Sequence, residues 1–246
     1  MINLLIDIGN SEIKTAIGNP LNNSLKKIIR FPYEKNHFEK DIKNIFGNLY
    51  PEAIPGKIGL SILKDADENF LEKFFLRKYK IKPVFIKRDM KLPVSIRYSE
   101  GIGNDRICNA AAAAGLYDYK NIMVIDFGTA TTYTLISDNI LTGGVILPGI
   151  KTSLNSLVKK TSLPEVNLSF PKNLINRNTA DNIKAGVLYQ SLYSAERIIT
   201  ETAGKYNGLF VIATGGYSKL ISSKTKLINK TDMYLSLKGI NIIISQ

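Results

Sequence analysis

Two short segments of this chain place an aspartate and a glycine directly after an apolar run. Asp7 and Gly9 form the first pair, and Asp126 and Gly128 repeat it 119 positions later. Each order predicts a strand, a tight turn and a second strand. A glycine turn lets backbone N–H groups approach phosphate oxygens, and a carboxylate beside it can hold a screening cation. Each aspartate could instead cap its own turn, but the repetition favours a site built from two related halves.

Lys14 and the pair Gly215-Gly216 could serve the same phosphate chemistry. Lys14 lies on the strand after the first turn, where it could face a bound anion; an exposed strand lysine is the alternative. Gly215-Gly216 follows an apolar run and would suit the adenosine end of a nucleotide, although a plain turn would also explain it.

The sequence GNDR, from Gly103 to Arg106, stands at the start of an alanine-rich helical run. There Asp105 could act as the general base toward a substrate hydroxyl while Arg106 holds a substrate carboxylate. A helix-capping aspartate beside a surface arginine is the alternative. Phosphoryl transfer needs mainly positioning, charge screening and an oriented nucleophile, so these few groups would be enough for a kinase.

Several other chemistries are excluded or disfavoured by composition. No G-x-x-x-x-G-K-[ST] loop is present, and His37 is the only histidine, which argues against P-loop enzymes, histidine triads and HExxH zinc proteases. Cys108 is the only cysteine, which excludes a cysteine-rich zinc site. We interpret Cys108 as a small apolar residue. No apolar run reaches the roughly 20 residues that span a bilayer. The chain begins on a strand rather than a signal peptide, which predicts a cytoplasmic protein with no membrane partner.

The net charge of +12 permits nucleic acid, an acidic membrane or small anions as ligands. No basic block is interleaved with aromatic residues, and no nucleic-acid motif is present. We therefore interpret the charge as a lysine-rich surface that favours phosphate-bearing ligands, and expect no nucleic-acid partner.

The pattern of apolar residues predicts an α/β protein of two related halves, 1–117 and 118–246. The first half has the order βββαβαβ, followed by a helix over 105–117. The second half opens with the Asp126 hairpin and a third strand, and continues with helices starting near 149 and 178. A strand over 209–213 and a closing helix over 233–245, for which a strand is the alternative, complete it.

Seven motifs occur in an order that resembles type III pantothenate kinases. They are DIGNS (7–11), GNDR (103–106), DFGTA (126–130), GGVILPG (143–149), SLPEV (162–166), NTADNIKAG (178–186) and TGG (214–216). This family belongs to the superfamily of actin-like proteins, sugar kinases and heat-shock ATPases. The resemblance implies duplicated ribonuclease H-like (actin-like ATPase) domains, each a mixed sheet flanked by helices, with the active site in the cleft between them.

The resemblance also implies an activity, namely ATP-dependent phosphorylation of pantothenate to 4′-phosphopantothenate, the first step toward coenzyme A. It implies a homodimer that uses Mg²⁺ and a monovalent cation, K⁺ or NH₄⁺. Asp105 would be the proton acceptor, and Asp126 would bind the monovalent cation. ATP would contact Asp7, Ile8, Gly9, Asn10, Ser11, Glu12, Ile13, Lys14 and Thr129, with Asp7 also near Mg²⁺. Pantothenate would contact Tyr98, Gly103, Asn104, Asp105, Arg106 and Thr179.

Two departures from the family pattern are visible. Ser11 stands where a threonine is usual, which keeps the hydroxyl, and the segment between Tyr98 and Gly103 is about two residues shorter and lacks its usual proline. The shorter segment leaves a sugar kinase of the same superfamily open as an alternative. A regulatory or accessory paralogue without turnover is the non-enzymatic alternative.

Overall fold

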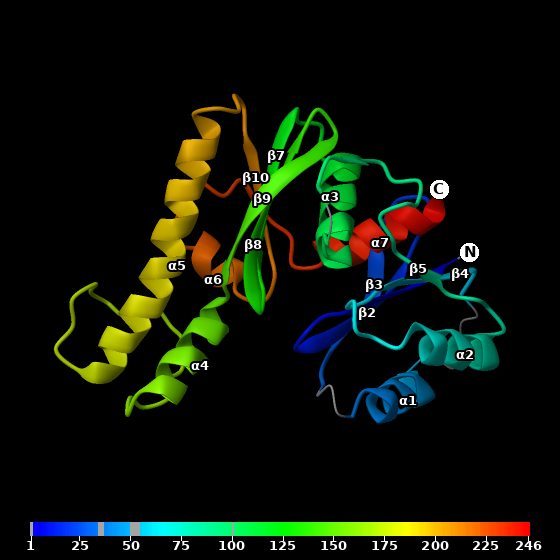
Figure 1. Cartoon of the computed structure of the whole chain (residues 1–246), viewed down its shortest axis with the longest axis horizontal. Helices are drawn as coiled ribbons and strands as arrows, with labels where there is room; N and C mark the ends of the chain where they lie inside the picture. The colour runs from blue at the N-terminus through cyan, green and yellow to red at the C-terminus, as the bar shows by residue number, and fades with distance from the viewer. Residues whose placement is uncertain (1, 34–36, 50–54, 100) are drawn as a thin grey trace. The chain divides into compact units, whose positions relative to one another are not determined.

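The computed structural model describes residues 2–33, 37–49, 55–99 and 101–246 (Figure 1). The chain divides into two compact units. Unit 1 comprises Met1–Tyr117 together with Leu235–Gln246, and unit 2 comprises Asp118–Tyr234. Residues 235–246, which the sequence pattern had assigned to the second half, therefore belong to the first unit.

Unit 1 is built on a five-stranded mixed sheet. Its strands are β1 (Asn3–Ile8), β2 (Glu12–Gly18), β3 (Leu25–Pro32), β4 (Lys57–Ser61) and β5 (Val84–Phe85), in the order β3-β2-β1-β4-β5. The remaining elements are α1 (Phe38–Leu49), α2 (Glu68–Tyr79), β6 (Ser95–Ile96), α3 (Asn104–Leu116) and α7 (Leu235–Ser245). The predicted order βββαβαβ is confirmed. The apolar spacing of residues 34–48 predicts the first helix, and residues 34–36 of this range lie outside the described residues.

Unit 2 repeats the same strand order. Its elements are β7 (Asn121–Phe127), β8 (Ala130–Ser137), β9 (Ile140–Pro148), α4 (Ile150–Lys160), α5 (Thr179–Ala203), β10 (Phe210–Thr214), α6 (Ser218–Ser222) and β11 (Lys230–Thr231). Within this unit the strands run β9-β8-β7-β10-β11, the counterpart of β3-β2-β1-β4-β5. The first three strands pair antiparallel and the last three parallel, as in unit 1.

The two aspartates occupy equivalent places in the two sheets. Asp7 is paired with Lys14 on β2 and with Ser61 on β4. Asp126 is paired in the same way with Thr132 on β8 and with Thr214 on β10. The repetition read from the sequence is therefore a repetition of structure, which confirms the duplicated α/β fold.

The alternation of side chains along β1 decides which helices cover each face of the first sheet. Leu4, Ile6 and Ile8 point into an apolar core with Phe46 of α1 and Phe75 of α2. Residues 3, 5 and 7 point to the opposite face, where Asn3 and Asp7 contact side chains of α7. Asp7 is thus carried by the face that α7 covers.

The core of unit 2 forms between its sheet and α5. Met123, Ile125 and Phe127 alternate along β7 and pack with apolar residues of α5 such as Leu188 and Leu192. Asn178 caps this helix by accepting a hydrogen bond from the Asp181 N–H at 2.8 Å. Within the described part of the chain, no helix is both long and apolar enough to cross a membrane.

The C-terminal helix α7 packs tightly against α3 and the first sheet (Figure 1). A Cβ atom on Gly239 would overlap the backbone carbonyl of Cys108 on α3, so no other residue fits without movement. Gly59 on β4 leaves room for Ile240 and Ile244 in the same way. Burial raises the pKa of the Cys108 thiol well above its ordinary value, which is consistent with a small neutral core residue.

We predict that Gly239→Ala lowers the free energy of unfolding by about 1–3 kcal/mol, because the added methyl group overpacks the contact with Cys108. The matched control is Gly47→Ala in α1, where the new Cβ would have no described atom within 4 Å apart from its chain neighbours and the helix's own backbone. Alanine is the better helix former, so the control should gain about 0.5–1 kcal/mol. Urea unfolding of both variants measures this. A Gly239→Ala protein as stable as the wild type would contradict the close packing.

Candidate active site

The first glycine turn joins β1 to β2 and is held by backbone hydrogen bonds. The Gly9 N–H donates to the Glu12 carbonyl at 3.0 Å, and the Tyr33 hydroxyl donates to the Gly9 carbonyl at 2.7 Å. Asn10 and Ser11 at the tip are exposed. The turn is therefore fixed from below and open at its tip, as a phosphate-binding loop requires. Tyr33 had no signal in the sequence, because it precedes the first helix with no recognisable motif.

The Asp7 carboxylate is buried at the end of β1 and is contacted from two sides. The Ser236 hydroxyl donates a hydrogen bond to Asp7 Oδ2 at 2.7 Å. The Lys14 ammonium lies 3.6 Å from the same oxygen and 3.5 Å from Glu12. With its side chain only 16% exposed, Lys14 is not the solvated strand lysine that was the alternative.

Asp105 occupies the first turn of α3, one residue after the helix begins. The N-cap position is Gly103, which supplies no side-chain cap, and a Cβ there would collide with Asp105 Oδ1. Asp105 Oδ1 accepts a hydrogen bond from the Arg106 N–H at 2.8 Å. The neighbouring Asn104 donates its side-chain amide to the Ile62 carbonyl at 3.1 Å, which ties the start of the helix to the end of β4.

Arg106 is buried, and the ring of Tyr98 covers its guanidinium group. The guanidinium carbon lies 5.0 Å from the ring centroid, and Nη1 lies 3.4 Å from the Tyr98 hydroxyl. Arg106 is therefore not the surface arginine of the alternative interpretation. A planar guanidinium held against an aromatic ring suits a carboxylate ligand. The structure also places Tyr98 beside the GNDR motif despite the shortened segment, of which residue 100 lies outside the described residues.

The pKa of Asp105 is raised above its ordinary value. Burial among the surrounding protein atoms is the first cause, and the negative charge of Asp7 is the second; Arg106 and Lys14 oppose them. The Asp105 side chain is nevertheless exposed to solvent. Asp7, in the same unit, is the charged neighbour that disfavours the ionised form of Asp105. The raised pKa makes Asp105 a stronger base than an isolated aspartate.

The second glycine turn, in unit 2, packs closely against two other glycines, Gly149 and Gly215. Gly215 has a φ of +88°, and a Cβ there would collide with Asp126 Oδ1 and the Phe127 backbone. Gly149 packs onto the other side and donates its N–H to the Thr129 carbonyl at 3.1 Å. The backbone of the Gly215 turn therefore lies close to Asp126, which is half-buried. The Thr129 side chain is exposed.

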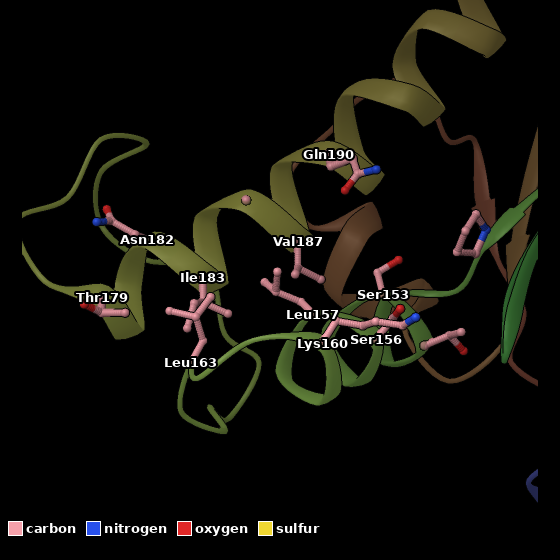
Figure 2. Close-up of a pocket in the computed structure, with 13 residues that line it drawn as sticks. Ser153, Ser156, Leu157, Lys160, Leu163, Thr179, Asn182, Ile183, Val187 and Gln190 are labelled. Atoms are coloured by element: carbon pink, nitrogen blue, oxygen red, sulfur yellow. The ribbon is translucent and has the colours of Figure 1, made fainter.

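Thr179 is the first residue of α5 and lines a recess between α4 and α5 (Figure 2). The recess has a volume of about 960 Å³. Leu157, Leu163, Ile183 and Val187 give it an apolar lining, while Asn182 lies next to Thr179 at one end (Figure 2). Thr179 is exposed to solvent at this end of the recess.

The predicted residues thus divide between the two units. Unit 1 brings together Asp7, Lys14, Tyr98, Asp105 and Arg106, and unit 2 carries Asp126, Thr129 and Thr179. The sequence did not identify Ser236, which contacts Asp7 from the other end of the chain. A lone serine in an apolar helix carries no motif that could have singled it out.

The residues present fit a magnesium ion that arrives with a nucleotide. Mg²⁺ is usually bound by one or two carboxylates together with substrate phosphates and water. Asp7, a hard oxygen ligand beside the glycine turn, meets this requirement alone. Among the described residues, no group of three or more His, Cys, Asp or Glu side chains could form an all-protein metal site.

Two solved structures share the fold of this chain at low sequence identity. A Baf family protein from Campylobacter jejuni has a TM-score of 0.61 at 21% identity, covering 98% of this chain and 96% of that one. A ROK family glucokinase from Streptomyces griseus, in complex with glucose and AMPPNP, has a TM-score of 0.54 at 9% identity over the full length of both chains. These similarities support the duplicated ribonuclease H-like fold.

Sequence comparison identifies the family itself. A sequence model of the family described as type III pantothenate kinase matches residues 3–201. The type III pantothenate kinase of Fusobacterium nucleatum subsp. nucleatum is 33% identical, in an alignment that covers 96% of this chain and 95% of that protein. With the Asp7 turn and the GNDR helix start in place, the chain belongs to the type III pantothenate kinase family.

Proposed function

We propose that this enzyme transfers the γ-phosphoryl group of ATP to a hydroxyl of pantothenate, giving 4′-phosphopantothenate and ADP, the first step of coenzyme A biosynthesis. The observation that carries the proposal is the position of Asp105, a carboxylate of raised pKa in the same unit as the Asp7–Lys14 turn and next to the buried Arg106. A base, a phosphate-binding turn and a carboxylate-binding cation are the groups that this reaction needs.

In this proposal the GNDR motif supplies the base, and the Asp7 turn binds the phosphates. Asp105 accepts the proton of the pantothenate hydroxyl as its oxygen forms a bond to the γ-phosphorus. The bond from that phosphorus to the bridging oxygen breaks, and ADP leaves with the electron pair. The backbone of residues 8–13, Lys14 and the Thr129 hydroxyl hold the phosphates in line. Mg²⁺, when bound near Asp7, supplies charge neutralisation on the phosphate oxygens.

Arg106 is the group best suited to the carboxylate of pantothenate. Its guanidinium is buried and held in place by Tyr98, so little rotamer freedom remains to be lost on binding. Gly103 exposes backbone at the start of α3, and Asn104 fixes that backbone to β4. Thr179 would complete the pocket. These assignments support pantothenate over a neutral sugar, because a sugar offers no anion to pair with Arg106.

We further propose a monovalent cation site at Asp126 and a homodimeric enzyme. Asp126 is a half-buried carboxylate at the place in unit 2 that corresponds to Asp7, with Thr132 at the register position that Lys14 occupies in unit 1. A half-buried carboxylate at the end of a strand can take K⁺ or NH₄⁺. Family membership and the place of Thr179 on the open recess support the homodimer. Sedimentation equilibrium that gave the mass of one chain would refute it.

We expect Asp105→Asn to lower kcat by about 10²- to 10⁴-fold, because the amide cannot accept the hydroxyl proton. The affinity for MgATP should stay near that of the wild type. A coupled assay of ADP formation, with and without pantothenate, measures the effect. Asp89→Asn, at an exposed aspartate of the same unit, is the matched control and should keep wild-type activity. Full turnover in Asp105→Asn would remove the base from the mechanism.

The charge of Asp7 predicts how the pKa of Asp105 responds to its neighbours. A base works only when deprotonated, so the raised pKa moves the acid limb of kcat/KM toward higher pH. Asp7→Asn should lower the pKa of Asp105, and Lys14→Met should raise it, because Lys14 opposes Asp7. Carboxyl ¹³C NMR titration of the nucleotide-free protein reads this pKa directly. Shifts of the same sign in both variants would contradict the electrostatic picture.

We predict that wild-type activity rises with K⁺ or NH₄⁺ at constant ionic strength, and that Asp126→Asn abolishes this stimulation. The physical reason is that the amide removes the negative charge that binds the cation. Initial rates against KCl, with a choline salt as the balancing electrolyte, give the measurement. Asp138→Asn, at an exposed turn of unit 2, serves as the control. Stimulation that survives in Asp126→Asn would place the cation elsewhere.

A further inference from the structure

The C-terminal helix α7 brings one polar side chain to the phosphate-binding end of β1. This helix lies outside residues 3–201, the part of the chain that matches the family model. It nevertheless belongs to unit 1, where it packs against α3 and the first sheet (Figure 1). Its first turn carries Ser236, which is 5% exposed.

Ser236 makes a short buried hydrogen bond to the Asp7 carboxylate. The Ser236 hydroxyl donates to Asp7 Oδ2 at 2.7 Å, and Asp7 is also only 5% exposed. The ammonium of Lys14 lies 3.6 Å from the same oxygen. Hydrogen bonds from a hydroxyl to an ionised carboxylate are among the stronger ones in proteins. One oxygen of Asp7 is therefore held from two directions.

The helix is fastened to the sheet by other contacts, so the Ser236 bond is not needed for its docking. Asn3 at the opposite end of β1 donates to Asn241 Oδ1 at 2.9 Å and to the Ser245 hydroxyl at 3.1 Å. Asn241 in turn donates to the Asn19 carbonyl at 2.9 Å. Gly239 and Ile240 supply close packing against α3 and β4. These contacts lie along the helix beyond Ser236.

We infer that Ser236 is a positioning residue for Asp7: its hydroxyl fixes the orientation of the carboxylate toward the magnesium and phosphates of ATP. The inference rests on the proposed role of Asp7. Without the hydroxyl, the carboxylate could rotate about its side-chain torsions toward Lys14 alone. Partners that orient a metal-binding carboxylate typically contribute 10- to 100-fold in metal affinity or activity.

The test compares MgATP binding in Ser236→Ala, Ser236→Thr and Ser236→Cys by titration calorimetry, without pantothenate. We expect the alanine variant to bind MgATP about 10- to 100-fold more weakly. Threonine keeps the hydroxyl and should restore most of the affinity. The thiol of cysteine fills the same space but is a weak donor, so that variant should resemble alanine. If the alanine variant does not fold, the cysteine variant provides the same comparison.

Two controls separate orientation of Asp7 from simple docking of the helix. Ser245→Ala removes a hydroxyl from the far end of α7 and should leave MgATP affinity unchanged. In an Asp7→Asn background, Ser236→Ala should add no further loss, because both changes act on one interaction. Wild-type affinity in Ser236→Ala, an equal loss in Ser245→Ala, or an additive loss with Asp7→Asn would each overturn the inference.

The proposed function and this inference fail in different ways. If the wild-type protein binds MgATP but makes no ADP when pantothenate is added, the choice of acceptor is wrong while the binding comparison still decides the role of Ser236. If pantothenate-dependent turnover is present and Ser236→Ala binds MgATP normally, only the role of Ser236 is wrong.

Discussion

The contact between α3 and α7 at Gly239 is the constraint on which the unit 1 site depends. Because no side chain separates the two backbones there, both helices can lie on the same face of the first sheet. The first turn of α3 then presents Asp105 and Arg106, and the first turn of α7 presents Ser236 beside Asp7. Three segments that are remote in sequence thus meet around one strand end, and each arrives on a rigid element rather than on a loop.

The two halves share one strand order but surround their aspartates differently. Asp7 lies between a lysine and a serine hydroxyl, whereas the backbone of the Gly215 turn lies close to the Asp126 carboxylate. The first arrangement balances the carboxylate charge and orients it, which suits a ligand as highly charged as a metal–triphosphate. The second places the Gly215 backbone close beside the carboxylate, where we propose a weakly held monovalent ion. The two units therefore share one strand arrangement, and the residues around each aspartate favour different proposed ligands.

The reactivity proposed for Asp105 comes from opposing influences on one carboxyl group. The positive end of the α3 dipole and the charges of Arg106 and Lys14 favour its ionised form. The surrounding protein and the charge of Asp7 favour the protonated form and win, which raises the pKa. A ligand that neutralises Asp7 would weaken one of these influences, so the basicity of Asp105 is linked to what is bound at the Asp7 turn. The same carboxylate thereby serves both the phosphates and, through its charge, the base.

The sequence by itself determined the strands, the glycine turns and the positions of Asp7, Asp105 and Asp126, because period-2 and period-3.6 patterns and turn residues are local signals. It also predicted the closing helix, but not the unit in which that helix packs. Only the tertiary structure decided that Lys14 points at Asp7, that Arg106 is buried under Tyr98, and that Ser236 reaches Asp7 across 229 positions of sequence. Such contacts depend on how helices dock on a sheet, and docking depends on space left at Gly239 and Gly59, which no local pattern records.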